Sequence, residues 1–309
     1  MTLKEKRKLF HTENGAALPG LLTFRGIEKQ DVYNCSAPFI HDGKEYIFGR
    51  VEMRADYANS TTWLFEKTGE NEYSVVPGSV VYPIEDPFVQ IINGEIVLGG
   101  THVRKTKGRI DEYRVYFYRG TDPRMLSHFT CGPSMMKDVR LVGLENGAVG
   151  VFSRQRHSER TARYNTSTVI GYAEIPSLDE LDADVIDNAP IIENLFQKDE
   201  WGGCNQCHLL KDGRIGIIGH GSYGETDADG IEQLVYLNIA FIFDPKTFKA
   251  TEIKIIGDKP SYPVVGSKKP NLKDCAFTSG IVMLADGKVK LYSGLGDIAE
   301  GVITIDAPF

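Results

Sequence analysis

The chain has 309 residues, of which 41% are hydrophobic and 25% charged, and its formal net charge is −7. This composition is ordinary for a globular protein with a sizeable core, and the negative charge argues against a nucleic-acid partner because a phosphate backbone would be repelled. No stretch of the sequence approaches the roughly 20 apolar residues of a membrane span, so we expect no membrane partner either.

The first residues and the cysteines predict a cytoplasmic protein. Met1 to Phe10 are rich in charge, and the apolar run that follows is too short for the core of a signal peptide. The chain has five cysteines, an odd number, and they are scattered over its length. Such usage favours reduced thiols over a disulfide framework.

Short runs rich in Val, Ile, Phe and Tyr follow one another along the chain and predict β-strands. These runs are Glu45–Val51, Thr61–Phe65, Phe88–Ile92, Glu95–Leu98, Tyr113–Tyr118, Val139–Leu144, Val149–Phe152, Val169–Ala173, Arg214–Ile218, Leu237–Phe243, Ile281–Leu284 and Lys288–Tyr292. Helical signal is nearly absent, and its best candidate is the short acidic segment Ser177–Ala183. The pattern predicts an all-β protein.

Five Asp-Gly or Asn-Gly turns each lie between two apolar or β-branched runs, which is a strong signal for a β-hairpin. Their glycines are Gly43, Gly94, Gly147, Gly213 and Gly287. Their spacing of 51 to 74 residues leaves room for a four-stranded sheet in each module. We therefore predict one domain, residues 1–309, folded as a five-bladed β-propeller, in which the β-type run 301–305 pairs with the first blade and closes the ring.

Unusual polar residues recur at fixed distances from these turns. Eight or nine residues before the turn glycines lie Asn34, Asp86, Asp138 and Asn205. Seven or eight residues after them lie Arg50, His102, Arg154 and His220. The fifth module is looser, with Asp274 before its turn and Asp297 after it. Because the two ends of a hairpin lie side by side, about 25 Å from the turn at roughly 3.3 Å per residue, five converging hairpins would enclose one polar pocket.

Within this pocket Asp86 is the candidate catalytic carboxylate. Glu85 and Asp86 are adjacent, so they point to opposite faces of a strand, and Asp86 has the parity that faces the pocket. Pro87 biases Asp86 toward an extended backbone. The alternative interpretation is a turn carboxylate held by backbone amides.

Cationic and proton-donating side chains from two neighbouring modules suit an oxyanion such as phosphate, because charge-assisted hydrogen bonds are the strong ones. They are Lys137, Arg154, His208 and His220. Arg50 and Glu52 alternate along one strand and share a face, which suits the hydroxyls of a sugar. Solvated surface charges and a polar rim are the alternatives.

The run Cys204–His208 matches the c-type haem attachment pattern, but that attachment requires export, for which the sequence contains no signal. Cys204, Cys207, His208 and His220 could also supply a tetrahedral zinc site. Free thiols beside an active site are the interpretation we favour. We therefore expect no metal and no organic cofactor.

Seven motifs, in chain order, resemble the pocket motifs of the β-mannoside phosphorylases, which are family 130 of the glycoside hydrolases and five-bladed propellers. The motifs are Asn34, Gly49–Glu52, Glu85–Pro87, Lys137–Asp138, Phe152–Arg154, Gly219–Gly221 and Tyr292–Asp297. Over nearly its whole length the chain resembles more closely a formerly uncharacterised domain family, now grouped with glycosyltransferase family 108, which includes β-1,2-mannosyl transferases and phosphorylases.

This resemblance implies a role for each matching position. Asp86 matches the single proton donor, which acts through a sugar hydroxyl. Phosphate contacts are implied for Lys137, Arg154 and His220, with His208 near a position where a lysine is expected. Mannose contacts are implied for Asn34, Arg50 and Asp297. We add four further pocket residues as substrate-binding candidates: Glu52, His102, Asp138 and Asn205.

Two departures favour the transferase-like branch. Phe88 stands where family 130 has an arginine, and Lys137–Asp138 replaces an Arg-Asn pair. We expect an inverting β-mannoside phosphorylase or β-1,2-mannosyltransferase, with a mannose-containing oligosaccharide and inorganic phosphate or α-mannose 1-phosphate as substrates. Phosphate arrives as an anion, so one acid and a cationic cradle are sufficient. A β-mannoside hydrolase, with Asp138 or Asp297 as the second carboxylate, and a non-catalytic carbohydrate-binding propeller are the alternatives.

Overall fold

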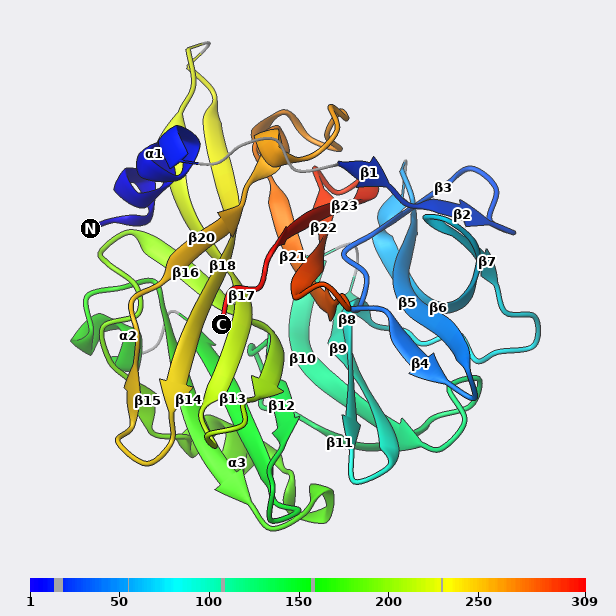
Figure 1. The fold of residues 1–309 in the computed structure, drawn as a ribbon, viewed down its shortest axis with the longest axis horizontal. Helices are drawn as coiled ribbons and strands as arrows, with labels where there is room; N and C mark the ends of the chain where they lie inside the picture. Colours follow the sequence, from blue (N-terminus) through cyan, green and yellow to red (C-terminus); the bar gives the residue numbers. More distant parts are fainter. Residues whose placement is uncertain (14–18, 55, 107–108, 157–158, 229) are drawn as a thin grey trace.

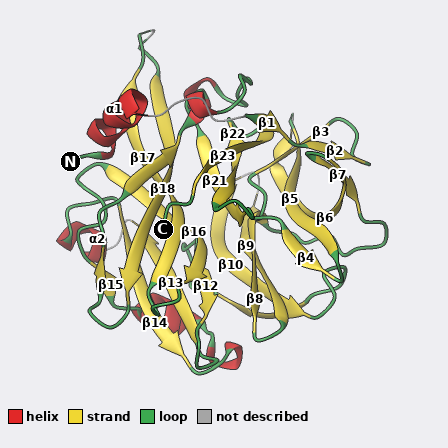
Figure 2. Ribbon diagram, viewed as in Figure 1, coloured by secondary structure: helices red, strands yellow, loops and turns green. Residues whose placement is uncertain are grey.

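Five β-sheets are arranged as the blades of a propeller (Figures 1 and 2), which confirms the predicted fold. The computed structural model describes residues 1–13, 19–54, 56–106, 109–156, 159–228 and 230–309. All twelve strand runs expected from the sequence overlap observed strands. The first blade contains β2 (Thr23–Arg25), β3 (Gln30–Tyr33), β4 (Phe39–His41), β5 (Lys44–Met53), β6 (Asp56–Gly69) and β7 (Glu72–Val75).

The second and third blades are four-stranded sheets whose strands follow chain order across the sheet. The second contains β8 (Glu85–Ile92), β9 (Glu95–Thr106), β10 (Arg109–Gly120) and β11 (Ser127–Cys131). The third contains β12 (Arg140–Gly143), β13 (Val149–Arg156), β14 (Thr168–Ile175) and β15 (Ile191–Ile192).

The fourth blade also follows chain order, and the fifth includes a strand from the beginning of the chain. The fourth contains β16 (Glu200–Leu209), β17 (Ile215–Thr226), β18 (Glu232–Asp244), β19 (Lys249–Ala250) and β20 (Lys254–Gly257). The fifth contains β21 (Ala276–Met283), β22 (Lys288–Leu295), β23 (Ala299–Asp306) and β1 (Gly20–Leu21).

Each predicted turn joins the innermost strand of a blade to the next strand. All five turn glycines have a positive φ, between 74° and 85°, which a side chain would disfavour. In the first two turns the preceding residue is also left-handed, with φ of 47° at Asp42 and 51° at Asn93. That pair of conformations is the type I′ geometry that suits the twist of a hairpin.

Ring closure differs in detail from the expectation. The terminal run 301–305 lies in β23, which pairs with β22 and with β1, Gly20 lying opposite Val302. The N-terminal strand therefore completes the fifth blade, whereas we expected the C-terminal strand to pair with the first blade. Either arrangement covers the edge of β23 and connects the two ends of the chain.

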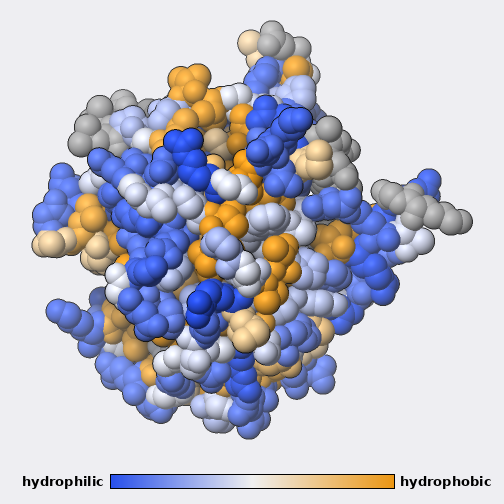
Figure 3. Space-filling model, turned by 90° about the vertical axis from the view of Figure 1, so that its right-hand side faces the viewer, coloured by the Kyte–Doolittle hydropathy of each residue, from blue (hydrophilic) through white to orange (hydrophobic). Residues whose placement is uncertain are grey.

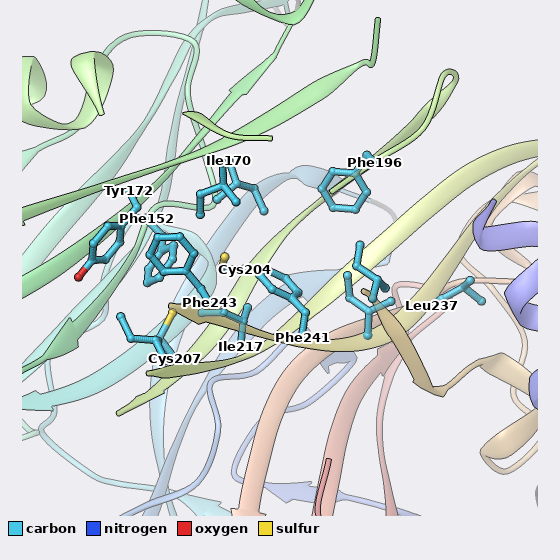
Figure 4. Close-up of a cluster of buried hydrophobic side chains, with 14 of the residues drawn as sticks. Phe152, Ile170, Tyr172, Phe196, Cys204, Cys207, Ile217, Leu237, Phe241 and Phe243 are labelled. Carbon is cyan, nitrogen blue, oxygen red and sulfur yellow. The ribbon is translucent and has the colours of Figure 1, made fainter. Parts of the chain in front are cut away.

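The core consists of five clusters of buried hydrophobic side chains, one between each pair of neighbouring blades. Figure 4 shows the cluster between the third and fourth blades, where Phe152 lies against Tyr172 and Phe243. Full burial of one such side chain contributes about 1.5–3 kcal/mol. Hydrophilic residues cover most of the face shown in Figure 3, and hydrophobic residues form small patches between them.

The expectation that helices are nearly absent is wrong at the N-terminus. Three α-helices and three 3₁₀ helices are described: α1 (Leu3–Glu13), α2 (Glu159–Arg163), α3 (Ala183–Asn188), η1 (Leu178–Glu180), η2 (Lys259–Ser261) and η3 (Pro270–Leu272). Helix α1 is mostly charged, so its sequence carries little amphipathic signal. The segment expected to be helical, Ser177–Ala183, forms η1 and the start of α3. The helices in the described part of the chain are too short or too polar to span a bilayer.

Candidate active site

The start of the innermost strand carries an Asn or Asp in an unusual backbone conformation in three blades. Asn34, Asp86 and Asp138 have φ of 46°, 52° and 60°. In the fourth blade, Asn205 is the extra residue of a β-bulge between Cys204 and Gln206. Asn and Asp adopt left-handed backbone more readily than other side-chain-bearing residues, so these positions accept few other residues.

Asp86 is buried, with 6% of its surface exposed, and two residues of the first blade donate to its carboxylate. Asn34 Nδ2 lies 2.8 Å and Arg50 Nη1 2.9 Å from Asp86 Oδ1. Both contacts use the same oxygen, and within the described residues no group donates to Oδ2. One carboxylate oxygen is therefore fixed, and the other is available to a substrate.

Arg50 also binds Glu52, which in turn contacts Lys268. Burial favours the neutral form of Glu52, but Arg50 and Lys268 outweigh it and lower its pKa to about 2. Lys268 Nζ lies 2.9 Å from the Tyr33 hydroxyl and 4.7 Å from the centre of its ring. Glu52 is thus ionised at neutral pH and binds two cations, Arg50 and Lys268.

A second group of charges lies in the third and fourth blades. Arg154 Nη1 donates to Asp138 Oδ2 at 2.6 Å, and His220 Nε2 lies 4.0 Å from the same oxygen. Burial favours protonation of Asp138, but Arg154 and Lys137 outweigh it and hold its pKa well below the usual range. Asp138 is therefore ionised, and Arg154, which also donates to the Gly202 carbonyl at 2.7 Å, joins the two blades.

His220 is buried and neutral near pH 7. Burial lowers its pKa well below the ordinary value, although Asp138 opposes this shift. His220 Nδ1 lies 2.7 Å from Asn205 Oδ1, which can only accept, so Nδ1 carries the proton and Nε2 has the lone pair. Its ring packs on Phe277 at 4.8 Å, which fixes its direction.

Lys137 connects the two groups of charges. Its side chain is half-buried, and burial opposes its charge, but Asp138 and Asp86 raise its pKa above the usual range. The ammonium group is therefore charged and lies within electrostatic reach of both carboxylates. Across the described residues, Lys137 makes no hydrogen bond and no ion pair. Among the described residues, the Lys137 ammonium group therefore lies near two carboxylates without binding either.

Asp297 belongs to the same region. It follows β22 with a φ of 59°, and burial, only partly offset by Arg50, raises its pKa. Asp86 and Glu52 raise the pKa of Asp297 further, so its carboxyl lies close to the first two blades. The structure thus brings together nine of the predicted residues from all five blades: Asn34, Arg50, Glu52, Asp86, Lys137, Asp138, Arg154, His220 and Asp297, with Asn205 behind His220.

Two predicted residues lie elsewhere, which corrects the expected pocket. Arg50, Arg154 and His220 each lie seven residues after the glycine of their turn. In the second blade that position is Thr101, and His102 is one residue further along. It therefore faces away, bonding the Pro83 carbonyl at 2.8 Å and stacking on Tyr116 at 4.5 Å. His208 lies opposite Gly216 near the hairpin turn, with its ring beside Phe309, and does not reach the phosphate-binding candidates.

The cysteine motif is part of the core. Cys204 and Cys207 are buried in the cluster between the third and fourth blades (Figure 4), whereas the His220 ring lies between Asn205 and Asp138. In the part of the chain that the structure describes, no three His, Cys, Asp or Glu side chains are grouped to hold a metal ion. The four residues considered for zinc therefore do not form a site.

Sequence reasoning missed Lys268, Ser279 and Glu300. Ser279 lies eight residues before Gly287 and is the extra residue of a bulge. The spacing of eight or nine residues before the turn glycine therefore identifies Ser279 in the fifth blade. Asp274, which we expected there, binds Arg7 instead. Ser279 donates to Glu300 at 2.6 Å. Lys268 lies in an irregular segment with no sequence signal.

The buried carboxyl group of Glu300 should make the stability of the folded protein depend on pH. It is fully buried, and burial raises its pKa from 4.5 to about 7. The folded protein therefore keeps a proton that the unfolded chain loses above pH 4.5, so this group's contribution to stability falls as the pH rises from 4.5 through 7. The loss reaches about 3 kcal/mol above pH 8.

Glu300→Gln, which mimics the protonated acid, should therefore raise the free energy of unfolding relative to wild type at pH 8 and have little effect at pH 4.5. Urea unfolding at the two pH values measures the difference. Glu232→Gln, at an exposed residue, is the control. A Glu300→Gln variant that is less stable than wild type at pH 8 would contradict the assignment.

Comparison with known proteins places the chain in a family. The family described as "Protein of unknown function (DUF1861)" matches residues 9–309. No curated protein matches the chain. The solved structure of MPT-4, a mannose phosphorylase from Leishmania mexicana in complex with phosphate ion, is 48% identical, with a TM-score of 0.93 over 99% of this chain and 93% of that one.

Two further structures are similar. MPT-1, a GDP-Man-dependent mannosyltransferase from Leishmania mexicana, is 44% identical, with a TM-score of 0.92 over 100% of this chain and 95% of that one. The β-1,2-mannobiose phosphorylase from Listeria innocua has a TM-score of 0.62 over 91% of this chain and 92% of that one, but its 11% identity shows the fold alone. The chain therefore belongs to the DUF1861 family and is a homologue of the Leishmania mannose phosphorylase and mannosyltransferase.

Proposed function

We propose that this protein transfers mannosyl units reversibly between a β-1,2-mannoside and phosphate, with inversion at the anomeric carbon. The observation that carries the proposal is a group of neighbouring charged side chains in which one carboxyl has an oxygen, and two cations have donors, that no described residue binds. Asp86 supplies the carboxyl, and Lys137 and Arg154 supply the cations. The two Leishmania homologues, a mannose phosphorylase and a mannosyltransferase, support mannose as the transferred sugar.

Asp86 is the proton donor in this proposal. Its Oδ1 accepts from Asn34 and Arg50, so the proton is carried on Oδ2. In the direction of phosphorolysis this proton passes, through a sugar hydroxyl, to the glycosidic oxygen as its bond to C1 breaks. In synthesis the same oxygen of Asp86 takes the proton back from the attacking hydroxyl.

Phosphate lies against the third and fourth blades. Arg154 uses Nε for the Gly202 carbonyl and Nη1 for Asp138, so Nη2 has no partner among the described residues. Lys137 Nζ is equally available, and the lone pair of His220 Nε2 can accept from the hydroxyl of a singly protonated phosphate. A phosphate oxygen then attacks C1 from the side opposite the leaving oxygen, giving α-mannose 1-phosphate. The anion is its own nucleophile, so no catalytic base is needed.

A hydrolase would need a second carboxylate to activate water. Asp138 is a poor candidate because Arg154 binds it at 2.6 Å and its low pKa makes it a weak base. Asp297, whose pKa is raised, is the stronger candidate for that role. In our proposal Asp297 instead binds mannose hydroxyls together with Asn34 and Arg50.

The remaining part of the mannoside occupies a cleft between the first and second blades. The cleft has a volume of about 210 Å³ and is lined mainly by polar residues, among them Asn59, Ser60, Glu85, Thr101 and His102. Ser60 and Glu85 both contact Arg50, so the cleft adjoins the acid. The cleft lies between the first and second blades, whereas the phosphate-binding candidates belong to the third and fourth, and an inverting reaction needs the leaving group and the phosphate on opposite faces of the sugar.

His102→Ala tests this cleft. We expect the KM for β-1,2-mannobiose to rise about 2- to 10-fold, the value of one neutral hydrogen bond, while the KM for phosphate stays unchanged. Initial rates with each substrate varied in turn measure both constants. A rise in the phosphate KM alone would place the leaving sugar elsewhere.

Two reactions test the function. In the first, the protein is incubated with α-mannose 1-phosphate and a panel of mannose-containing acceptors, and the released phosphate is measured. In the second, the reverse direction, it is incubated with β-1,2-mannobiose with and without phosphate. Phosphate-dependent formation of α-mannose 1-phosphate is the expected result. Free mannose formed without phosphate would indicate a hydrolase, and absence of turnover a sugar-binding propeller. A parallel reaction with GDP-mannose, measuring GDP, tests a nucleotide-sugar donor.

A cytoplasmic location is part of the proposal. Cys35, Cys204, Cys207 and Cys275 are buried as free thiols, and Cys131 is a half-buried one, as expected in a reducing compartment. Expression of a tagged protein followed by cell fractionation would test it.

A further inference from the structure

The connection between β20 and β21 carries a lysine into the active site. This segment, residues 258–275, includes η2 and η3, and the side chain of Lys268 in its middle is only 5% exposed. Lys268 contacts Glu52, Glu52 binds Arg50 at 2.9 Å, and Arg50 binds Asp86 at 2.9 Å. The lysine is therefore two side chains away from the acid.

One residue of helix α1, Arg7, forms ion pairs with both ends of this segment. Arg7 Nε lies 2.9 Å from Asp258, the first residue after β20. Its Nη1 and Nη2 lie 2.7 and 2.8 Å from Asp274, two residues before β21. The Arg7 side chain is 12% exposed and that of Asp258 is fully buried, so solvent screens these ion pairs little.

Helix α1 is itself anchored to the fourth blade. The Leu3 side chain is 2% exposed and would meet any side chain at Gly221, and the Leu3 amide donates to Glu200 at 2.5 Å. Lys6 donates to the Ile253 carbonyl at 2.8 Å. In Figure 1, α1 (blue) lies beside the strands of this blade, with the connection from β20 to β21 drawn in orange. The helix thus has a fixed position from which Arg7 holds the segment.

We propose that α1 is a positioning element of the active site: Arg7 sets the span of the 258–275 segment so that Lys268 reaches Glu52 and keeps Arg50 directed at Asp86. Arg7 and Lys268 are positioning residues, since neither touches Asp86. Without Arg7, Asp258 and Asp274 lose the cation that links them, the segment between them loosens, Lys268 withdraws, and Arg50 becomes the only cation for Glu52. Among the described residues no hydrogen bond or ion pair joins Lys137, Arg154 or His220 to this segment, so we expect these phosphate-binding candidates to stay in place.

Kinetics of Arg7→Met test the proposal, which rests on the proposed function for its activity readout. We expect kcat for mannosyl transfer to fall about tenfold, as for a small misplacement of a reacting group, while the KM for phosphate stays within about twofold. Because Arg7 acts through Lys268, adding Arg7→Met to Lys268→Met should cause little further loss of kcat. The matched control is Arg25→Met, which removes an exposed arginine paired with Glu72 and should change neither constant.

Hydrogen exchange of the same variants gives a readout that does not depend on activity. Amides in residues 259–274 should exchange faster in Arg7→Met than in wild type and not in Arg25→Met. Unchanged exchange in that segment, a wild-type kcat in Arg7→Met, additive losses in the double variant, or a parallel rise in the phosphate KM would each overturn the proposal. If wild type shows no mannosyl transfer, the proposed function fails, and exchange alone decides the positioning role.

Discussion

Replacing Asp86 with asparagine is expected to lower kcat for phosphorolysis of β-1,2-mannobiose by about 10²- to 10⁴-fold, the usual contribution of a general acid. An amide cannot supply the proton that the glycosidic oxygen needs. Asparagine accepts the left-handed backbone of this position, where φ is 52°, and can still accept from Asn34 and Arg50. We therefore expect the variant to fold and to bind substrate with an affinity near that of wild type.

A substrate with a good leaving group separates an acid from a structural residue. With p-nitrophenyl β-mannoside the leaving oxygen needs little protonation, so the loss in kcat should be much smaller than with mannobiose. Asp42→Asn is the matched control, because Asp42 is also left-handed, with φ of 47°, and its side chain is exposed in a hairpin turn. Equal losses with both substrates, or more than a tenth of wild-type activity on mannobiose, would remove Asp86 from the acid role.

Lys137→Gln is expected to raise the KM for phosphate about 10- to 100-fold with little effect on the KM for the mannoside. A hydrogen bond to a charged group contributes roughly 1.5–3 kcal/mol, and the lysine lies near Asp138 and Asp86 with no hydrogen-bond partner among the described residues. Its removal leaves no buried anion unpaired. The same change at Arg154 would be harder to interpret, because loss of the partner of buried Asp138 costs about 3–5 kcal/mol of stability.

Initial rates at varied phosphate and fixed mannoside measure this effect, and Lys211→Gln, at an exposed turn of the fourth blade, serves as the control. The shift should persist at high salt, because the interaction is sheltered from solvent. An unchanged phosphate KM combined with a weakened mannoside KM would mean that Lys137 binds the sugar and that the anion lies elsewhere.

The sequence alone determined the number of blades and most of the pocket, because both depend on local rules. An Asp-Gly or Asn-Gly turn requires left-handed backbone wherever it occurs, and a hairpin then places residues at equal distances from the turn side by side. Asn34, Asp86, Asp138 and Asn205 were therefore found by counting. The same rule applied to the fifth module identifies Ser279, which carries no charge to attract notice.

Only the tertiary structure decided which of the counted residues face the pocket. Side chains of a strand alternate between its two faces, so an error of one residue turns His102 away from Asp86 and toward Pro83 and Tyr116. The partners of Lys268 and Arg7 are more than 200 residues away in the chain, at Glu52 and at Asp258 and Asp274. Ion pairs of that kind depend on the packing of whole blades against one another, which no local pattern of residues encodes.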